Sequence, residues 1–175
     1  MLLAAYVALR RGDAVGVQTF GGRDLWLPPR RGRDTLQRIL GELYSVDATL
    51  TPPDYADAAR KLLERQKRRA LLIVLTNLRD EDDAELAPTV ATLKSRHVVL
   101  TASLRESALR DAVAREVRTF DDALLVAGAV QYAEHRARQH ERLRASGVRV
   151  LDVEPEALPI ALVNEYLDIK RAQRL

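Results

Sequence analysis

Five polar residues with side-chain oxygen atoms lie in predicted loops or at the ends of predicted strands. They are Thr51, Asp54, Asn77, Asp80 and Ser103. Open α/β sheets bind ligands in the crevice beyond the carboxyl ends of their strands, and we expect these residues to gather there. The sequence therefore predicts a surface for a ligand or a protein partner.

The alternative at the same edge is a metal-dependent hydrolase or a phosphoryl-processing enzyme that uses the carboxylates of Asp54, Asp80 and Asp82. It lacks a recognisable base and nucleophile. The chain has no cysteine, and neither Ser103 nor Ser107 lies in the Gly-x-Ser-x-Gly turn that exposes a serine nucleophile. We expect a protein that is not an enzyme and has no catalytic residue.

The glycines and histidines form no recognised site. Gly21–Gly22 and Arg31–Arg33 do not follow a parallel strand with a phosphate-binding glycine pattern. His135 and His140 are five residues apart on one predicted helix, a spacing that does not bring both to one metal ion. We expect both on the solvated surface, and His97 as a boundary residue that opens a strand.

Three arginine clusters, at 30–33, 65–69 and 136–144, are candidate contacts for phosphates or for an acidic partner. The 28 basic and 25 acidic residues nearly balance, and aromatic residues make up only 5%. Nucleic-acid binding is a further alternative, which would show a steep salt dependence. Because each cluster lies at a helix end or on a solvated face, we expect no nucleic-acid partner.

The first part of the chain is predicted to form a hairpin among helices. Its elements are a helix at 1–11 buried on nearly every side, strands at 14–20 and 24–27 joined by Gly21–Gly22, and helices capped by Asp34 and Asp54. The helix after Asp34 places Leu36, Ile39, Leu40 and Leu43 on one buried stripe.

The remaining chain alternates strands with helices. Strands are expected at 70–76, 97–103 and 148–153. Helices are expected from the acidic run 80–83 through Leu93, at 109–113 and 121–145, and from Pro159 onward. The unbroken apolar run at 70–76 predicts a central parallel strand covered on both faces. The expected fold is a three-layer α/β/α domain over residues 1–175, with a mostly parallel, Rossmann-like sheet and an antiparallel edge hairpin.

This order of elements resembles a von Willebrand factor A-type domain from its first helix onward. At sequence level the chain is similar to the bacterial family catalogued as domain of unknown function 58. The segments that carry the similarity are 3–13, Phe20 with 27–32, Asp54–Tyr55, 65–69, 75–78 and 166–170. The resemblance implies a von Willebrand A-like domain that lacks its first strand, as part of a longer protein.

The resemblance also implies a degenerate metal-ion-dependent adhesion site. In A-type domains Mg²⁺ takes oxygen ligands from an Asp-x-Ser-x-Ser loop, a threonine and an aspartate, which suit a hard octahedral cation. No Asp-x-Ser-x-Ser occurs in this sequence. By position, Thr51 and Asn77 correspond to the threonine and the aspartate, and Asn77 brings no charge. We expect no bound cofactor, and Thr51 and Asn77 as the remaining ligands wherever Mg²⁺ does bind.

Family members are often encoded beside a MoxR-type AAA+ ATPase, so the resemblance implies a protein partner and a role in protein assembly or maturation. The leading expectation is a non-enzymatic interaction domain. A missing strand leaves unpaired backbone in the sheet, which predicts either self-association through a strand of another copy or completion by a segment outside this sequence. The lack of cysteine and of a run of about 20 apolar residues favours a cytoplasmic domain with no membrane segment, although its parent protein can carry an anchor.

Overall fold

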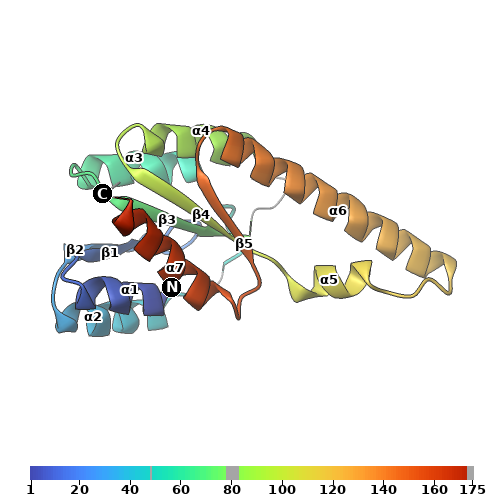
Figure 1. The fold of residues 1–175 in the computed structure, drawn as a ribbon, viewed down its shortest axis with the longest axis horizontal. Coiled ribbons are helices and arrows are strands. Elements are labelled where there is room, and N and C mark those ends of the chain that lie inside the picture. Colours follow the sequence, from blue (N-terminus) through green and yellow to red (C-terminus); the bar gives the residue numbers. More distant parts are fainter. Residues whose placement is uncertain (48, 78–82, 173–175) are drawn as a thin grey trace. The chain divides into compact units, whose positions relative to one another are not determined.

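The computed structural model describes residues 1–47, 49–77 and 83–172, and their contacts form two compact units. The terminal unit comprises Met1–Arg69 and Pro159–Leu175, and the sheet unit comprises Ala70–Leu158 (Figure 1). Each unit is described by itself below. A single domain over the whole chain stays a prediction.

The terminal unit holds an antiparallel hairpin and four helices within the described residues. The elements are α1 (Leu2–Arg10), β1 (Val15–Gln18), β2 (Trp26–Arg30), α2 (Arg33–Tyr44), α3 (Tyr55–Arg65) and α7 (Leu158–Arg171). The hairpin is confirmed, but its loop spans 19–25 instead of the two glycines alone. Thr19 explains the difference, because its hydroxyl donates to the carbonyl of Arg23 and accepts from the amide of Leu25.

A bulge lets β2 continue through two prolines. Val17 pairs with Leu27, whereas Val15 pairs with Arg30, so β2 contains one extra residue. A Cβ at Gly16 would lie 2.6 Å from the carbonyl oxygen of Leu27. Glycine is therefore required where the two backbones approach this closely.

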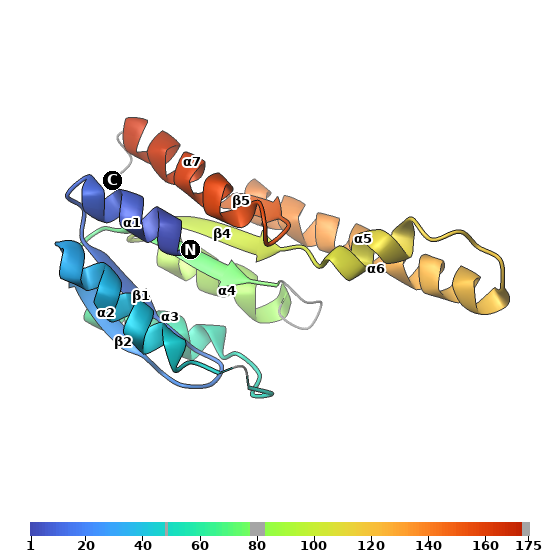
Figure 2. The ribbon, with the colours of Figure 1, turned by 90° about the horizontal axis from the view of Figure 1, so that it is seen from below.

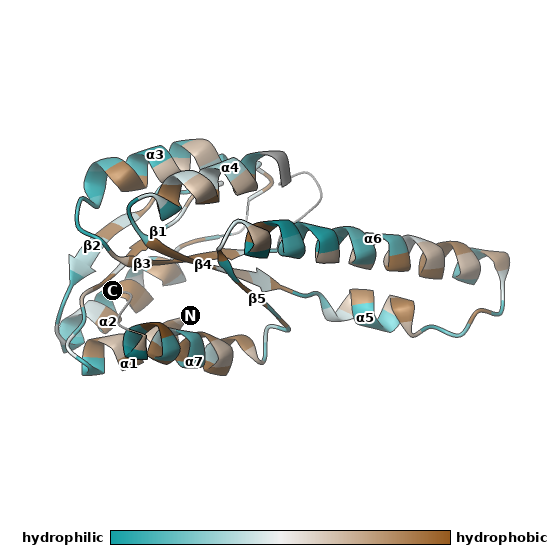
Figure 3. Cartoon of the chain, turned by 45° about the horizontal axis from the view of Figure 1, so that its top comes forward, coloured by the Kyte–Doolittle hydropathy of each residue, from teal (hydrophilic) through white to brown (hydrophobic). Residues whose placement is uncertain are grey.

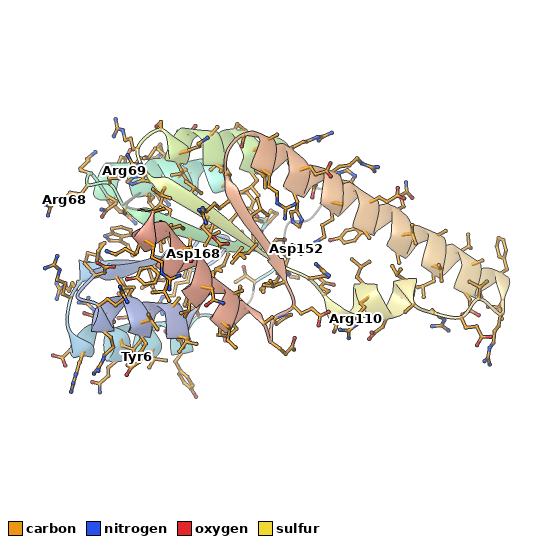
Figure 4. The ribbon with its side chains drawn as sticks, in the orientation of Figure 1. Tyr6, Arg68, Arg69, Arg110, Asp152 and Asp168 are labelled. Atoms are coloured by element: carbon orange, nitrogen blue, oxygen red, sulfur yellow. The ribbon has the colours of Figure 1, made fainter. Side chains whose placement is uncertain are left out.

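The helices of this unit follow the predicted pattern with two corrections. Helix α1 is not buried all round: its alanines are buried, whereas Leu2, Leu3 and Tyr6 are exposed (Figure 4). Helix α2 has Gly32, with φ of 98°, as its N-cap, and Asp34 lies in the first turn instead. A glycine reaches this backbone angle without the steric cost that aspartate would meet.

Two contacts organise the interior of the terminal unit. Leu25, Leu27 and Ile39 form a buried cluster, against which Val15 and Val17 pack with residues of α2. On α7, the Tyr166 hydroxyl donates to Asp13 at 2.6 Å and Lys170 pairs with the same carboxylate at 3.0 Å. Burial and the hydrogen bond to Asp13 raise the pKa of Tyr166 to about 12. The Tyr166 hydroxyl therefore stays protonated at neutral pH and remains a donor to the Asp13 carboxylate.

The sheet unit contains a three-stranded parallel sheet. Its strands are β3 (Leu71–Thr76), β4 (Val98–Leu104) and β5 (Arg149–Val153), in the order β3-β4-β5. Leu71 pairs with Val98, and Leu100 pairs with Arg149. The central strand is therefore β4, whose middle residues are all buried, and the prediction of β3 as the central strand is wrong for the part of the chain that is described.

Three helices complete this unit. They are α4 (Asp83–Lys94), α5 (Ser107–Val113) and α6 (Phe120–Ala145). Helix α4 contacts β4, α6 contacts β5, and the two helices contact each other, so they cover one face of the sheet. Leu86, Val90 and Leu93 are the buried side of α4, as the sequence pattern predicts.

The amino-terminal half of α6 extends past the sheet with α5 beside it (Figure 2). Thr119 and Asp122 form a reciprocal capping box at its start, and Gly147, with φ of 79°, follows its end. We call residues 107–145 the arm. Apolar residues gather in the half of α6 that lies far from the sheet (Figure 3). Among the described residues, no helix is both long and apolar enough to span a bilayer.

The mixed α/β prediction is thus confirmed at the level of helices, a parallel sheet and an antiparallel hairpin.

Candidate functional site

The five predicted surface residues fall in different parts of the chain. Thr51 and Asp54 belong to the terminal unit, and Asn77 and Ser103 belong to the sheet unit. Asp80 lies outside the described residues, as does Asp82 of the enzyme alternative. The two pairs are therefore considered separately.

Thr51 and Asp54 line a small pocket of about 200 Å³ beside the hairpin loop and the start of α3. Asp54 caps α3, as predicted, because its carboxylate accepts from the amide of Asp57 at 2.7 Å. The carboxylates of Asp24 and Asp57 both pair with Lys61. These acidic groups thus already have partners that stabilise the local fold.

Residues 1–47, 49–77 and 83–172 contain no group of three or more histidine, cysteine, aspartate or glutamate side chains that could hold a metal ion. The weak Mg²⁺ site predicted at Thr51 and Asn77 stays a prediction. The hydrolase and nucleic-acid alternatives likewise stay predictions of the sequence.

The carboxyl edge of the sheet is occupied by the guanidinium of Arg136, which comes from α6. It donates to the carbonyl of Asn77 after β3, and to the carbonyl of Leu104 at 2.8 Å and the Ser103 hydroxyl on β4. It also pairs with Asp152 of β5 at 3.0 Å. One side chain therefore joins the ends of all three strands.

Burial changes what these residues can do. Ser103 is 0% exposed and Arg136 is 5% exposed, so Ser103 lies in the interior instead of on the predicted partner surface. A guanidinium does not accept a proton from a serine. The hydrogen bond from Arg136 therefore does not activate Ser103 as a nucleophile, whereas the side chain of Asn77 remains exposed.

The arginine cluster at 136–144 is not wholly solvated, contrary to the prediction. Arg136, Gln139, His140 and Leu143 are the buried residues of α6, and their spacing of three, four and seven residues is that of one helical face. The sequence pattern contains this face, but three of its four residues are polar. A search for apolar stripes therefore misses it.

Asp152 is the anion at the centre of this buried face. Arg105 pairs with it at 2.9 Å, in addition to Arg136. Burial opposes ionisation of Asp152, but the hydrogen bonds and charges of Arg105 and Arg136, with His140 nearby, outweigh it and lower its pKa. Asp152 therefore remains charged well into the acid range.

His140 lies beside this ion pair, with Nδ1 3.6 Å from a carboxylate oxygen of Asp152. It is 2% exposed, not on the surface as predicted. Burial lowers the pKa of His140, Asp152 opposes the change, and the positive charges of Arg136, Arg144 and Arg105 lower it further. The imidazole is accordingly neutral at pH 7.

We expect this histidine to make stability depend on pH. Its pKa in the folded chain lies below the ordinary 6.5 of the unfolded chain, so as pH falls the unfolded state takes up a proton first. The free energy of unfolding then decreases between about pH 7 and pH 5. Urea denaturation across this range should show a smaller decrease for His140→Gln than for the unmodified chain.

The control for this prediction is His135→Gln, a change at a half-exposed histidine of the same helix. Equal pH dependence of His140→Gln and the unmodified chain would contradict the assignment to His140. Asp152 does not contribute to the change in unfolding free energy between pH 7 and pH 5, because its pKa is lowered and it titrates below this range.

A pocket of about 480 Å³ opens beside this ion pair, between α5, α6 and β5. Arg110 on α5 and Asp152 on β5 mark two of its sides (Figure 4). Arg110 pairs with both carboxylate oxygens of Glu154, at 2.8 and 2.9 Å. Arg144 also lines the pocket, and it makes no ion pair with the residues that the structure describes. The pocket thus combines buried and exposed cations.

The arm carries a set of exposed large apolar side chains, which we call the arm surface. It consists of Val113, Val117, Phe120, Leu124, Leu125 and Val130. Phe120 is 76% exposed and Leu124 is 57% exposed. Phe120 and Leu124 are one helical turn apart and share one side of α6, and large exposed apolar patches mark interaction sites in soluble proteins.

Comparison with known proteins adds one finding. A family model described as a protein of unknown function, DUF58, matches residues 1–149. The chain belongs to the DUF58 family. No curated protein and no solved structure matches it. The DUF58 region includes the arm, Arg136 and His140, and the match confirms the similarity to this family that was found in the sequence, without assigning an activity.

Proposed function

We propose that this DUF58 chain is a non-enzymatic protein-interaction domain. The arm surface is the observation that carries the proposal. Its six apolar residues lie on α5, on the loop after it and on the half of α6 that extends past the sheet. Burial of such side chains against a partner contributes about 25 cal/mol for each Å² removed from water.

The proposed fold is a von Willebrand A-like, three-layer domain that lacks its first strand. The separate two-stranded and three-stranded sheets support this proposal. Within the described residues, β3 is a terminal strand of its sheet although all but one of its residues are aliphatic. A strand from another copy, or from a segment outside this sequence, would pair along β3 in this proposal.

The proposed partner is a MoxR-type AAA+ ATPase, and the proposed role is protein assembly or maturation. The family resemblance supports both. We propose a cytoplasmic location, which the lack of cysteine favours, and no bound cofactor, because the adhesion site is degenerate. The exposed arm surface gives the partner an apolar contact area.

The proposal is tested by measuring binding between the chain and a MoxR-type ATPase encoded in the same genome. We expect Phe120→Ser combined with Leu124→Ser to weaken the Kd at least about tenfold, which corresponds to about 1.4 kcal/mol. Ile160→Ser is the matched control, since Ile160 is also an exposed apolar residue but lies on α7 of the terminal unit.

Two outcomes would contradict the proposal in different ways. Absence of binding by the unmodified chain would remove the ATPase as partner. Equal weakening by the Ile160→Ser control would remove the arm surface as the binding site. Thermal melting of each variant shows whether the fold is retained, and light scattering shows whether the chain self-associates.

A further inference from the structure

We propose that the pocket between α5, α6 and β5 binds an acidic side chain of a partner segment whose apolar residues pack on the arm surface. This inference rests on the proposed interaction function, and it specifies the chemistry of the partner. It is carried by the charge of the pocket, by the burial of its polar groups and by its continuity with the arm surface.

The side chains that line the pocket include more arginines than carboxylates. Its lining includes four arginines, at 105, 110, 136 and 144, against the two carboxylates of Glu141 and Asp152. Asp152 is shared between Arg105 and Arg136, and Glu154 pairs with Arg110. Because one carboxylate serves two guanidinium groups and Arg144 has no ion pair with the residues described, a further anion is the ligand that this lining favours.

Two polar side chains in the pocket wall, Arg136 and His140, are buried. Arg136 is fixed by the strand ends, and the Nε2 atom of His140 is buried without a hydrogen-bond partner among the residues that the structure describes. A buried polar atom of this kind costs stability unless a partner satisfies it. The guanidinium of Arg144, which lines the same pocket and is exposed, is the group that a ligand reaches from solvent.

The remaining wall is aliphatic. Leu109 and Val113 of α5 and Ala133 and Ala137 of α6 line the pocket, with Ala114. Val113 belongs to the pocket and to the arm surface at once. An acidic side chain in the pocket and apolar side chains beside it can therefore come from one continuous segment of a partner.

This combination favours an acidic, apolar protein segment over a nucleic acid. Single-stranded nucleic acids bind through aromatic stacking platforms together with cations, whereas the described residues that line this pocket include no phenylalanine, tyrosine or tryptophan. A carboxylate accepts two parallel hydrogen bonds from an arginine, and its aliphatic stem packs against leucine, valine and alanine. The lining fits these two requirements.

The test uses a fluorescent synthetic peptide in which glutamates and leucines share one helical face, and a second peptide with glutamine for each glutamate. Fluorescence polarisation should give a Kd at least about tenfold lower for the glutamate peptide. Added salt should raise this Kd. Equal affinity for the two peptides would overturn the proposal.

Charge reversal localises the binding to the pocket. We expect Arg144→Glu to raise the Kd of the glutamate peptide about tenfold. The matched control is Arg138→Glu on the same helix, since Arg138 is exposed and does not line the pocket. Its Kd should stay within about twofold of that of the unmodified chain, as for other exposed charges. Equal increases in Kd for the two variants would mean that the peptide binds by general charge attraction, and this would overturn the proposal that it binds in the pocket.

A second variant fills the pocket without changing its charge. Ala137 is exposed on α6 and lines the pocket, so Ala137→Trp should abolish most peptide binding while the melting temperature stays nearly unchanged. Retained binding would overturn the proposal. If Arg144→Glu leaves ATPase binding intact, the pocket inference fails and the proposed interaction function does not. If the peptide binds and the ATPase does not, the ATPase is the wrong partner and the pocket inference stands.

Discussion

Replacing Arg136 by methionine should lower the free energy of unfolding by about 3–5 kcal/mol, the cost of breaking a buried ion pair by removing one partner. Arg136 is 5% exposed and contacts Asp152, Ser103 and two strand-end carbonyls. Methionine fills much of the same space but donates no hydrogen bond. Asp152 then keeps only Arg105 as its cationic partner.

Urea denaturation measures this change directly. Arg138→Met is the control, because Arg138 lies on the same helix and is largely exposed, so its loss should cost less than about 1 kcal/mol. A double variant, Arg136→Met with Asp152→Leu, should lose less than the sum of the single variants, since neither buried charge then remains. Equal costs for Arg136→Met and Arg138→Met would show that the ion pair does not hold the strand ends together.

The second large effect should separate the central strand from the terminal strand of the sheet. Leu100 of β4 is 0% exposed, whereas Leu72 of β3 is only half-buried. We expect Leu100→Ala to cost about 2–5 kcal/mol, as for other fully buried leucines. Leu72→Ala should cost clearly less, because less apolar surface returns to water on unfolding.

The same urea experiment compares the two variants, which carry an identical chemical change in neighbouring parallel strands. Its outcome also bears on the missing strand. If Leu72→Ala costs as much as Leu100→Ala, β3 is covered in solution, and the strand order of the isolated sheet does not describe the folded chain. Light scattering would then decide whether another copy provides the cover.

The sequence predicts the elements well where local patterns determine them. The helix stripe of α4, the Asp54 cap and the Gly147 stop all depend on residues within a few positions. Local patterns do not determine which strand becomes central. Within the described residues the aliphatic β3 is a terminal strand and the more polar β4 is the central one, because pairing between distant segments decides burial.

The site is harder to predict for a related reason. Arg136 looks like a member of a solvated arginine cluster, and only the opposing Asp152 shows that it is buried. These residues are distant in sequence, and no spacing rule connects a helix face to the end of a later strand. The loop of Thr51 and Asp54 precedes α3 as predicted. Asp54 serves as the cap of that helix, and Asp57 within the helix pairs with Lys61.

The buried end of α6 also has a mechanical consequence. From Phe120 to Arg136 the helix runs without interruption, a distance of about 24 Å at 1.5 Å per residue. A force applied at Phe120 is therefore transmitted along the helix to the ion pair of Arg136 with Asp152, which anchors its buried end. Gly128 lies between them, and a glycine weakens a helix by about 1 kcal/mol relative to alanine. We therefore expect this stretch of α6 to bend most easily at Gly128.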